Sequence, residues 1–206
     1  MTLRKFVLPP PAAEAPAFER CEMCAERIGE EHGHVVNVGS RALMCVCRAC
    51  HLLFTRAEGR YLAVPDRYRH DPSFVLAAAD WEELRIPVRM AFFFHNSALG
   101  RTVAFYPSPG GATESELPLD TWERVLAANP SLSDPLPDVE ALIVDRRHGG
   151  GAGYLVPIDA CYRLTGLVRT HWKGFGGGQE AWEAIDSFFA ELRERSLPVP
   201  AGDGRG

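Results

Sequence analysis

Cys21-Glu-Met-Cys24 and Cys45-Val-Cys47-Arg-Ala-Cys50 contain five of the six cysteines of the chain within thirty residues. A Cys-x2-Cys pair turns tightly enough to place two thiolates on one tetrahedral metal ion, and two such pairs separated by 22 residues are typical of a structural zinc site. We therefore predict one metal ion bound by Cys21, Cys24, Cys47 and Cys50. Cys45 and Cys47 would face the same side of an extended strand, so Cys45 is expected near this metal, as a substitute ligand, a redox-sensitive neighbour or a buried apolar residue.

The residues around the cysteines indicate a small module over 18–64. Residues 34–38 alternate as a strand, Gly39-Ser-Arg41 provides a turn, and residues 42–46 return as a second strand. Cys47 and Cys50 then open a short helical segment. Each Cys-x2-Cys turn is a zinc knuckle. A first knuckle, a hairpin and a second knuckle at the start of a helix predict a treble clef, with a zinc ribbon as the alternative. About 45 residues cannot build an adequate core alone, so metal ligation would supply folding energy.

Zinc is the favoured metal, with iron as the alternative, because four thiolates suit either ion. Rubredoxin knuckles usually have a glycine just past the second cysteine, whereas Ala25 and His51 stand there in this chain. That difference favours zinc. Four protein ligands leave no position for a substrate water, which argues against a catalytic zinc.

The rest of the chain predicts an α+β body over residues 71–197, joined to the module by a charged linker from Asp66 to Asp71. Two successive hairpin-plus-helix units predict a four-stranded, mostly antiparallel sheet with covering helices on one face. The expected strands are 88–94, 101–106, 139–144 and 154–158, and the expected helices are 76–84, 120–128, 160–172 and 180–196. Asp120 and Asp159 are expected to cap two of these helices. We also expect this body to fold independently of the metal.

Other motifs in the body give weaker evidence of a functional site. The loop from Tyr106 to Ala112 contains Ser108 but lacks the G-x-S-x-G pattern of a nucleophile elbow. Cys161 is expected to be a small core residue. The two glycine-rich stretches, 149–153 and 174–178, are expected to be turns and not phosphate sites. Trp172 and Phe175 have two equally supported roles: they form a docking surface, or they pack the turn between the last two helices.

Composition and charge restrict the class of protein. Residues 1–70 have ten basic and eight acidic residues, whereas residues 71–206 have twelve and nineteen. The positive excess of two charges in residues 1–70 is too small for a surface that tracks phosphates, which argues against nucleic acid as the main partner. An export signal and a membrane span are not expected from the sequence, and clustered thiols fit a reducing cytoplasm. The Pro/Ala-rich segment 1–17 and the tail 198–206 are expected to be disordered.

Several stretches resemble a bacterial family of unknown function whose members are encoded beside [NiFe]-hydrogenase genes. The resemblance covers about residues 18–197 and is carried by residues 47–56, 104–110, 139–143, 156–162 and 182–196. It implies a cytoplasmic accessory role in hydrogenase assembly or electron supply, with a hydrogenase subunit or maturation factor as partner. The leading hypothesis is a non-enzymatic, protein-binding accessory factor with structural zinc. An iron-bound, rubredoxin-like electron carrier, a zinc-dependent nucleic-acid-binding regulator and an enzyme using the loop from Tyr106 to Ala112 are the alternatives.

Overall fold

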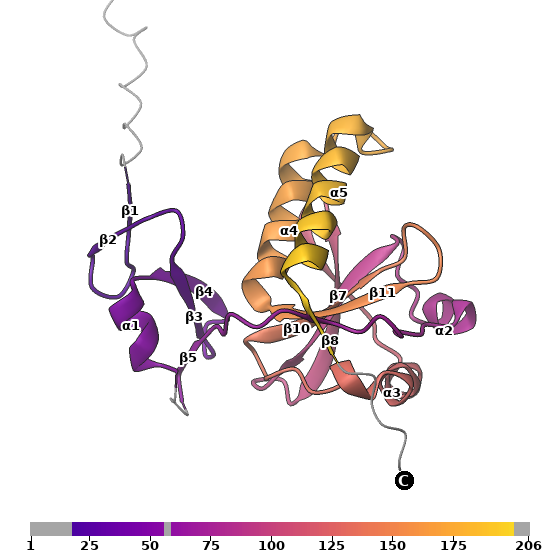
Figure 1. Ribbon diagram of the computed structural model, residues 1–206, viewed down its shortest axis with the longest axis horizontal. Helices are drawn as coiled ribbons and strands as arrows, with labels where there is room; N and C mark the ends of the chain where they lie inside the picture. Colours follow the sequence, from indigo (N-terminus) through magenta and orange to yellow (C-terminus); the bar gives the residue numbers. More distant parts are fainter. Residues whose placement is uncertain (1–17, 56–58, 200–206) are drawn as a thin grey trace, which may run out of the picture.

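The computed structural model describes residues 18–55 and 59–199 and confirms the α+β class. A small module with two short sheets precedes a body built on a seven-stranded sheet, and Figure 1 shows the two parts joined by an extended segment. The expected disorder of residues 1–17 and 200–206 concerns parts of the chain outside the described residues. Of the helices in the described ranges, none combines the length and the apolar run that a bilayer crossing needs.

The module has the element order of a treble clef. The strands β1 (Glu19–Arg20) and β2 (Arg27–Ile28) flank the first knuckle, and β3 (Gly33–Asn37) and β4 (Ala42–Val46) form the expected hairpin. The second knuckle opens α1 (Arg48–Leu53). A strand that the sequence analysis did not predict, β5 (Tyr61–Ala63), pairs with the free edge of β3 and completes the three-stranded sheet.

The sheet of the body has seven strands where four were predicted. Its order is β12-β6-β11-β10-β7-β8-β9, and only the pairing of β12 with β6 is parallel. The four expected strands are β7 (Met90–Asn96), β8 (Arg101–Ser108), β10 (Glu140–Asp145) and β11 (Ala152–Pro157). The additional strands are β6 (Arg69–His70), β9 (Gly111–Ser115) and β12 (Leu197–Pro198).

These additional strands come from segments predicted to be linker, loop and tail. β6 lies within the charged linker, β9 within the polar stretch after β8, and β12 at the start of the expected tail. Val199, which follows β12, is buried in the core. The prediction of a disordered tail beginning at residue 198 is therefore wrong for its first two residues.

Helices cover both faces of the sheet, and the prediction of a single covered face is wrong. One face packs against α4 (Ile158–His171) and α5 (Gly178–Arg195). The other packs against the region of α2 (Ala78–Glu83), α3 (Leu119–Ala128) and the 3-10 turn Pro130–Leu132. Figure 1 shows α4 and α5 side by side, with α2 and α3 on the far side of the strands. Both faces of β10 are consequently buried.

The N-cap residues of α3 and α4 differ from those that were predicted. Pro118 and Pro157 occupy the N-cap positions of α3 and α4, and neither offers a side-chain hydrogen bond. Asp120 and Asp159 lie instead in the first turns, where a carboxylate still interacts favourably with the helix dipole. This shift frees the Asp159 side chain to contact the module.

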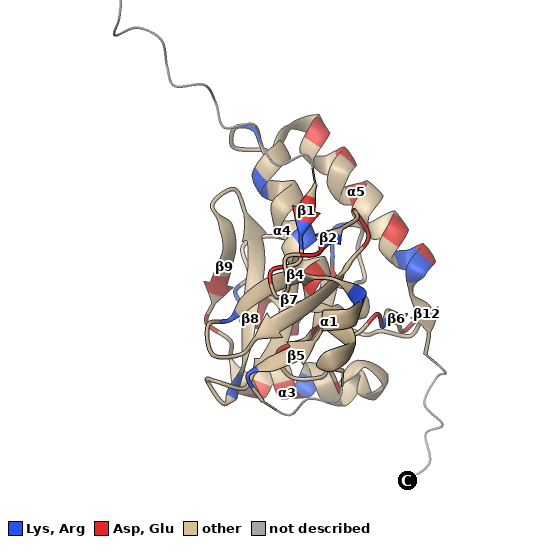
Figure 2. Ribbon diagram, turned by 90° about the vertical axis from the view of Figure 1, so that its left-hand side faces the viewer, with Lys and Arg blue, Asp and Glu red and all other residues tan. Residues whose placement is uncertain are grey.

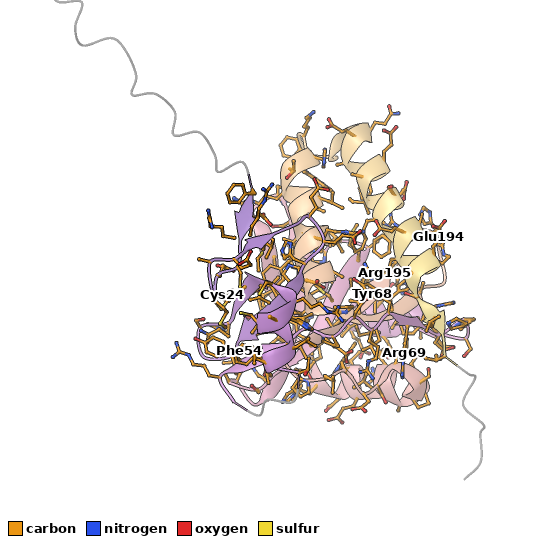
Figure 3. All side chains as sticks on the ribbon, turned by 60° about the vertical axis from the view of Figure 1, so that its left-hand side comes forward. Cys24, Phe54, Tyr68, Arg69, Glu194 and Arg195 are labelled. Carbon is orange, nitrogen blue, oxygen red and sulfur yellow. The ribbon has the colours of Figure 1, made fainter. Side chains whose placement is uncertain are left out.

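The module and the body share one hydrophobic cluster. Val36 and Val64 of the module are buried against the same cluster as Ile158 and Phe92 of the body. Farther along the connecting segment, Arg67 forms a bidentate pair with Glu140, which is fully buried. Figure 3 shows the same segment passing the end of α5, where Arg195 stacks on Tyr68 with 4.1 Å between the guanidinium carbon and the ring centroid. The independence of the body remains a prediction, because the two parts are in contact.

Candidate metal centre

The structure brings the four predicted ligands together. The sulfur atoms of Cys21, Cys24, Cys47 and Cys50 all lie within 4.8 Å of one another, and those of Cys24 and Cys47 are 3.7 Å apart. Zn–S bonds of about 2.3 Å in a regular tetrahedron would place neighbouring sulfurs about 3.8 Å apart. The arrangement therefore fits a divalent ion held entirely by thiolates. Cys21 and Cys50 are buried, whereas Cys24 lies at the surface, as Figure 3 shows.

Backbone hydrogen bonds fix both knuckles. The Ala25 N–H donates to the Cys21 carbonyl at 2.8 Å, and the Cys21 N–H donates to the Glu26 carbonyl at 2.8 Å. In the second knuckle, Cys47 is the N-cap of α1 and its sulfur accepts a 3.5 Å hydrogen bond from the Cys50 N–H. N–H donors directed at sulfur stabilise the thiolate form that a metal requires.

The acidities of these thiols show how strongly the four sulfurs interact. Burial raises the pKa of Cys21, but hydrogen bonds from the backbone of Cys47, Cys24 and Met23 outweigh it and bring the pKa down to about 6. Hydrogen bonding with the Cys24 side chain, together with burial, raises the pKa of Cys50 to about 12. Hydrogen bonding among the four sulfurs thus favours the thiolate form of Cys21 and the thiol form of Cys50. A bound divalent cation would favour the thiolate form of both.

Ala25 has the left-handed backbone conformation, with φ of 63°. This is the position at which rubredoxin knuckles usually have glycine, so the first knuckle adopts the glycine-type turn without a glycine. The missing glycine was the reason to favour zinc over iron, and that reason loses its force for the first knuckle. Both ions fit the four sulfurs.

Replacing Ala25 by glycine should stabilise the module. A left-handed conformation costs a residue with a Cβ about 1 kcal/mol, and glycine relieves this strain at some cost in unfolded-state entropy. We expect Ala25→Gly to raise the midpoint of chelator-induced unfolding, measured by circular dichroism with competing chelator. Ala42→Gly makes the same exchange at an exposed residue of β4 that has no positive φ, so it is the control and should not raise the midpoint. A lowered midpoint for Ala25→Gly would contradict the strain argument.

Cys45 does not belong to the four-cysteine group. Its partner across the hairpin is His34, and its sulfur clusters with His32 and His34. Val35 and Val46, on the opposite face of the hairpin, are the residues that pack with Cys21 and Cys50. Cys45 lies near the four cysteines as expected, because it packs against the same small cluster as Cys47. Its sulfur nevertheless groups with the two histidines, since the strand ends at Val46 and Cys47 belongs to the helix cap.

His32 and His34 were not among the residues predicted to bind metal. A usable signal was present, since His-x-His at the start of one strand and a cysteine near the end of the next place three ligands on one face.

Ser108 is a turn residue. Its hydroxyl donates to the Gly111 carbonyl at 2.9 Å and accepts from the Gly110 N–H and the Thr113 hydroxyl at 3.2 and 3.0 Å. These bonds close the hairpin between β8 and β9. Gly111 and Ala112 line a largely apolar cavity of about 430 Å³, together with Phe92, Phe94, Phe105 and Cys161 among others. Cys161 is buried in the core as expected, and burial raises its pKa well above the ordinary value.

The predicted docking residues have different environments. Trp172 packs on Gly177, and its ring centroid lies 5.6 Å from that of Trp182. Its indole N–H donates to the Gly174 carbonyl at 3.0 Å. Phe175, in the turn between α4 and α5, is fully exposed. Trp172 thus stabilises the turn that presents Phe175.

Comparison with known proteins gives a family without a described activity. No curated protein and no solved structure matches the chain. Residues 20–196, which include both knuckles and the seven-stranded sheet except β12, match a family of unknown function. The chain therefore belongs to the family of unknown function DUF5947.

Proposed function

We propose that this protein is a non-enzymatic accessory factor in which a structural zinc ion stabilises the N-terminal module and the body docks another protein. The four mutually close sulfurs are the observation that carries the proposal, because they fill a tetrahedral coordination sphere and leave no position for a substrate. The partner that we propose, a [NiFe]-hydrogenase subunit or maturation factor in the cytoplasm, rests on the family resemblance described in the sequence analysis.

Iron is the second candidate metal, because Ala25 adopts the turn that rubredoxin knuckles share. A rubredoxin-like iron centre would make the protein an electron carrier. Metal analysis of protein purified without added metal, combined with its visible spectrum, distinguishes the two. Zinc gives a colourless protein with one or more equivalents of zinc, whereas iron gives absorption bands that bleach on reduction.

The docking surface that we propose is the turn between α4 and α5. Phe175 presents a complete aromatic ring to solvent, and an aromatic side chain buries a large area at a small entropic cost when a partner covers it. Figure 2 shows acidic segments recurring along α5, the helix that follows this turn. Such a surface repels phosphate backbones, which favours a protein over a nucleic acid.

Phe175→Ala should weaken partner binding without changing the fold. Loss of an anchor contributing about 2 kcal/mol lowers affinity about 30-fold. We expect tagged wild-type protein to recover a hydrogenase subunit or maturation factor from native extract, and the variant to recover much less. Leu99→Ala is the control, because Leu99 is also exposed but lies in the turn between β7 and β8.

Three outcomes would contradict the docking proposal. They are equal recovery of the partner by wild type and Phe175→Ala, recovery of nucleic acid in place of protein, and the absence of any stable partner. Trp172→Ala is unsuitable as a first test because Trp172 holds the turn itself. A loss of binding in that variant would reflect disruption of the turn and not the loss of a contact with the partner.

A further inference from the structure

A second cluster of metal-ligating side chains lies on the face of the β3–β4 hairpin opposite to Val35 and Val46. His32, His34 and Cys45 each offer one ligand atom, and these three atoms lie within 4.8 Å of one another. The cross-strand pairing of His34 with Cys45 sets two of them side by side. His32 precedes His34 by two residues, and the two ring centroids are 4.9 Å apart.

His32 has a buried nitrogen atom without a partner. Its Nδ1 lies 2.8 Å from the Gly29 carbonyl oxygen, which can only accept, so Nδ1 carries the proton. Nε2 is then a lone-pair donor, and this atom is buried without a hydrogen-bond partner among the described residues. The side chain is only 11% exposed. A buried acceptor without a donor is unfavourable, and a metal ion would satisfy it.

His34 is oriented by a carboxylate of the body. Its Nδ1 lies 2.9 Å from Oδ2 of Asp159, in the first turn of α4. A histidine whose Nδ1–H donates to a carboxylate has its Nε2 lone pair free, which is the usual arrangement behind metal-binding histidines. The other Asp159 oxygen is buried and has no partner within the described chain. Asp159 thus connects this cluster to the body.

Cys45 is held by two backbone bonds that leave its sulfur free. The Cys45 N–H donates to the Glu22 carboxylate, and the Glu22 N–H donates to the Cys45 carbonyl at 2.9 Å. Glu22 lies between the two cysteines of the first knuckle, so the position of Cys45 depends on the four-cysteine centre. The two clusters are adjacent but have no ligand in common.

We propose that His32, His34 and Cys45 form a second metal site, which binds one divalent transition ion of the zinc type through two imidazole nitrogens and one thiolate. Asp159 is a positioning residue for His34. Imidazole and thiolate donors together suit Zn²⁺ and exclude hard ions such as Mg²⁺ and Ca²⁺. Three protein ligands leave a fourth tetrahedral position open.

The open position gives this site a different character from the four-cysteine centre. His32, His34 and Asp159 line a cleft of about 1100 Å³ between the module and the body. Water can approach the proposed site from the side that His32 and His34 present to this cleft. The first site has the ligand set of a structural ion, and the second has that of an ion whose ligands exchange.

Metal stoichiometry and cobalt spectroscopy on the full chain test this site. We expect wild-type protein to bind two equivalents of Zn²⁺. In a titration with Co²⁺, one equivalent should give the intense charge-transfer bands of four thiolates, and the other the weaker bands of one thiolate. His32→Asn and Cys45→Ser should each bind one equivalent and keep the four-thiolate spectrum. Asparagine at 32 can still donate to Gly29 and lacks the Nε2 ligand.

Two further variants complete the test. Asp159→Asn should still bind the second ion, but with an affinity about 10- to 100-fold lower, as expected for loss of a carboxylate behind a ligating histidine. His148→Gln removes an exposed histidine elsewhere and should bind two equivalents. One equivalent in the wild type, or two equivalents in both His32→Asn and Cys45→Ser, would overturn the proposal. Loss of the four-thiolate spectrum in His32→Asn or Cys45→Ser would show a single shared centre and overturn it equally.

Discussion

Cys21→Ser and Cys50→Ser should each release the four-cysteine metal ion and unfold residues 18–64. The core beside this site consists of five buried residues, two of which are the ligands themselves: Cys21, Ile28, Val35, Val46 and Cys50. Structural zinc contributes about 10–16 kcal/mol of binding energy in small metal-dependent modules, far more than so small a core can provide. Metal content and amide hydrogen exchange of the module, measured on the same samples, are the observables.

Two other cysteines serve as controls. Cys161→Ser removes a buried thiol from the body, so it should leave the metal content and the exchange pattern of the module unchanged. Cys45→Ser should keep the four-thiolate ion, because its sulfur lies outside that group. Full metal retention in both Cys21→Ser and Cys50→Ser would refute the ligand assignment. If Cys45→Ser lost this ion as completely as Cys50→Ser, the choice of four ligands out of five cysteines would be wrong.

The four-cysteine group could be predicted from the sequence because each knuckle is a local structure. Cys-x2-Cys fixes two ligands by short-range geometry, and the hairpin between the knuckles needs only alternation and a turn. The cluster of His32, His34 and Cys45 depends on strand register, and one residue of slip would move Cys45 to the other face. Asp159, 125 positions after His34, joins through tertiary packing that no local pattern contains.

The strands missed in the body are short or polar. β6 and β12 have two residues each, too few for any periodicity. β6 forms because β11 presents an edge to pair with, and β12 forms on the outer edge of β6. β9 reads Gly-Ala-Thr-Glu-Ser and is an edge strand with no fully buried residue. The second layer of helices was predictable. Continuous apolar runs such as Ala141-Leu-Ile-Val144 are typical of strands covered on both faces, whereas a sheet covered on one face alternates.

The body should fold without the module and without metal, provided that Arg67 is retained. Glu140 is fully buried in β10, and the Arg67 guanidinium is its cationic partner. Glu140 also accepts a 2.8 Å hydrogen bond from the Leu136 N–H. Removing one partner of a buried ion pair costs about 3–5 kcal/mol, because the remaining charge stays buried. Arg67 is 31% exposed, so we expect a cost of about 3 kcal/mol, at the lower end of that range.

A fragment of residues 66–199 should therefore melt cooperatively in the presence of chelator, whereas a fragment starting at Arg69 should melt about 10 °C lower. Arg67→Ala in the longer fragment should reproduce most of that loss. Arg101→Ala is the matched control, because it breaks an exposed pair with Glu114 that contributes at most about 1 kcal/mol. Equal melting temperatures for the two fragments would show that water replaces Arg67 at Glu140. A melt without a transition in both would show that Val36 and Val64 are indispensable, and that the module and the body are one folding unit.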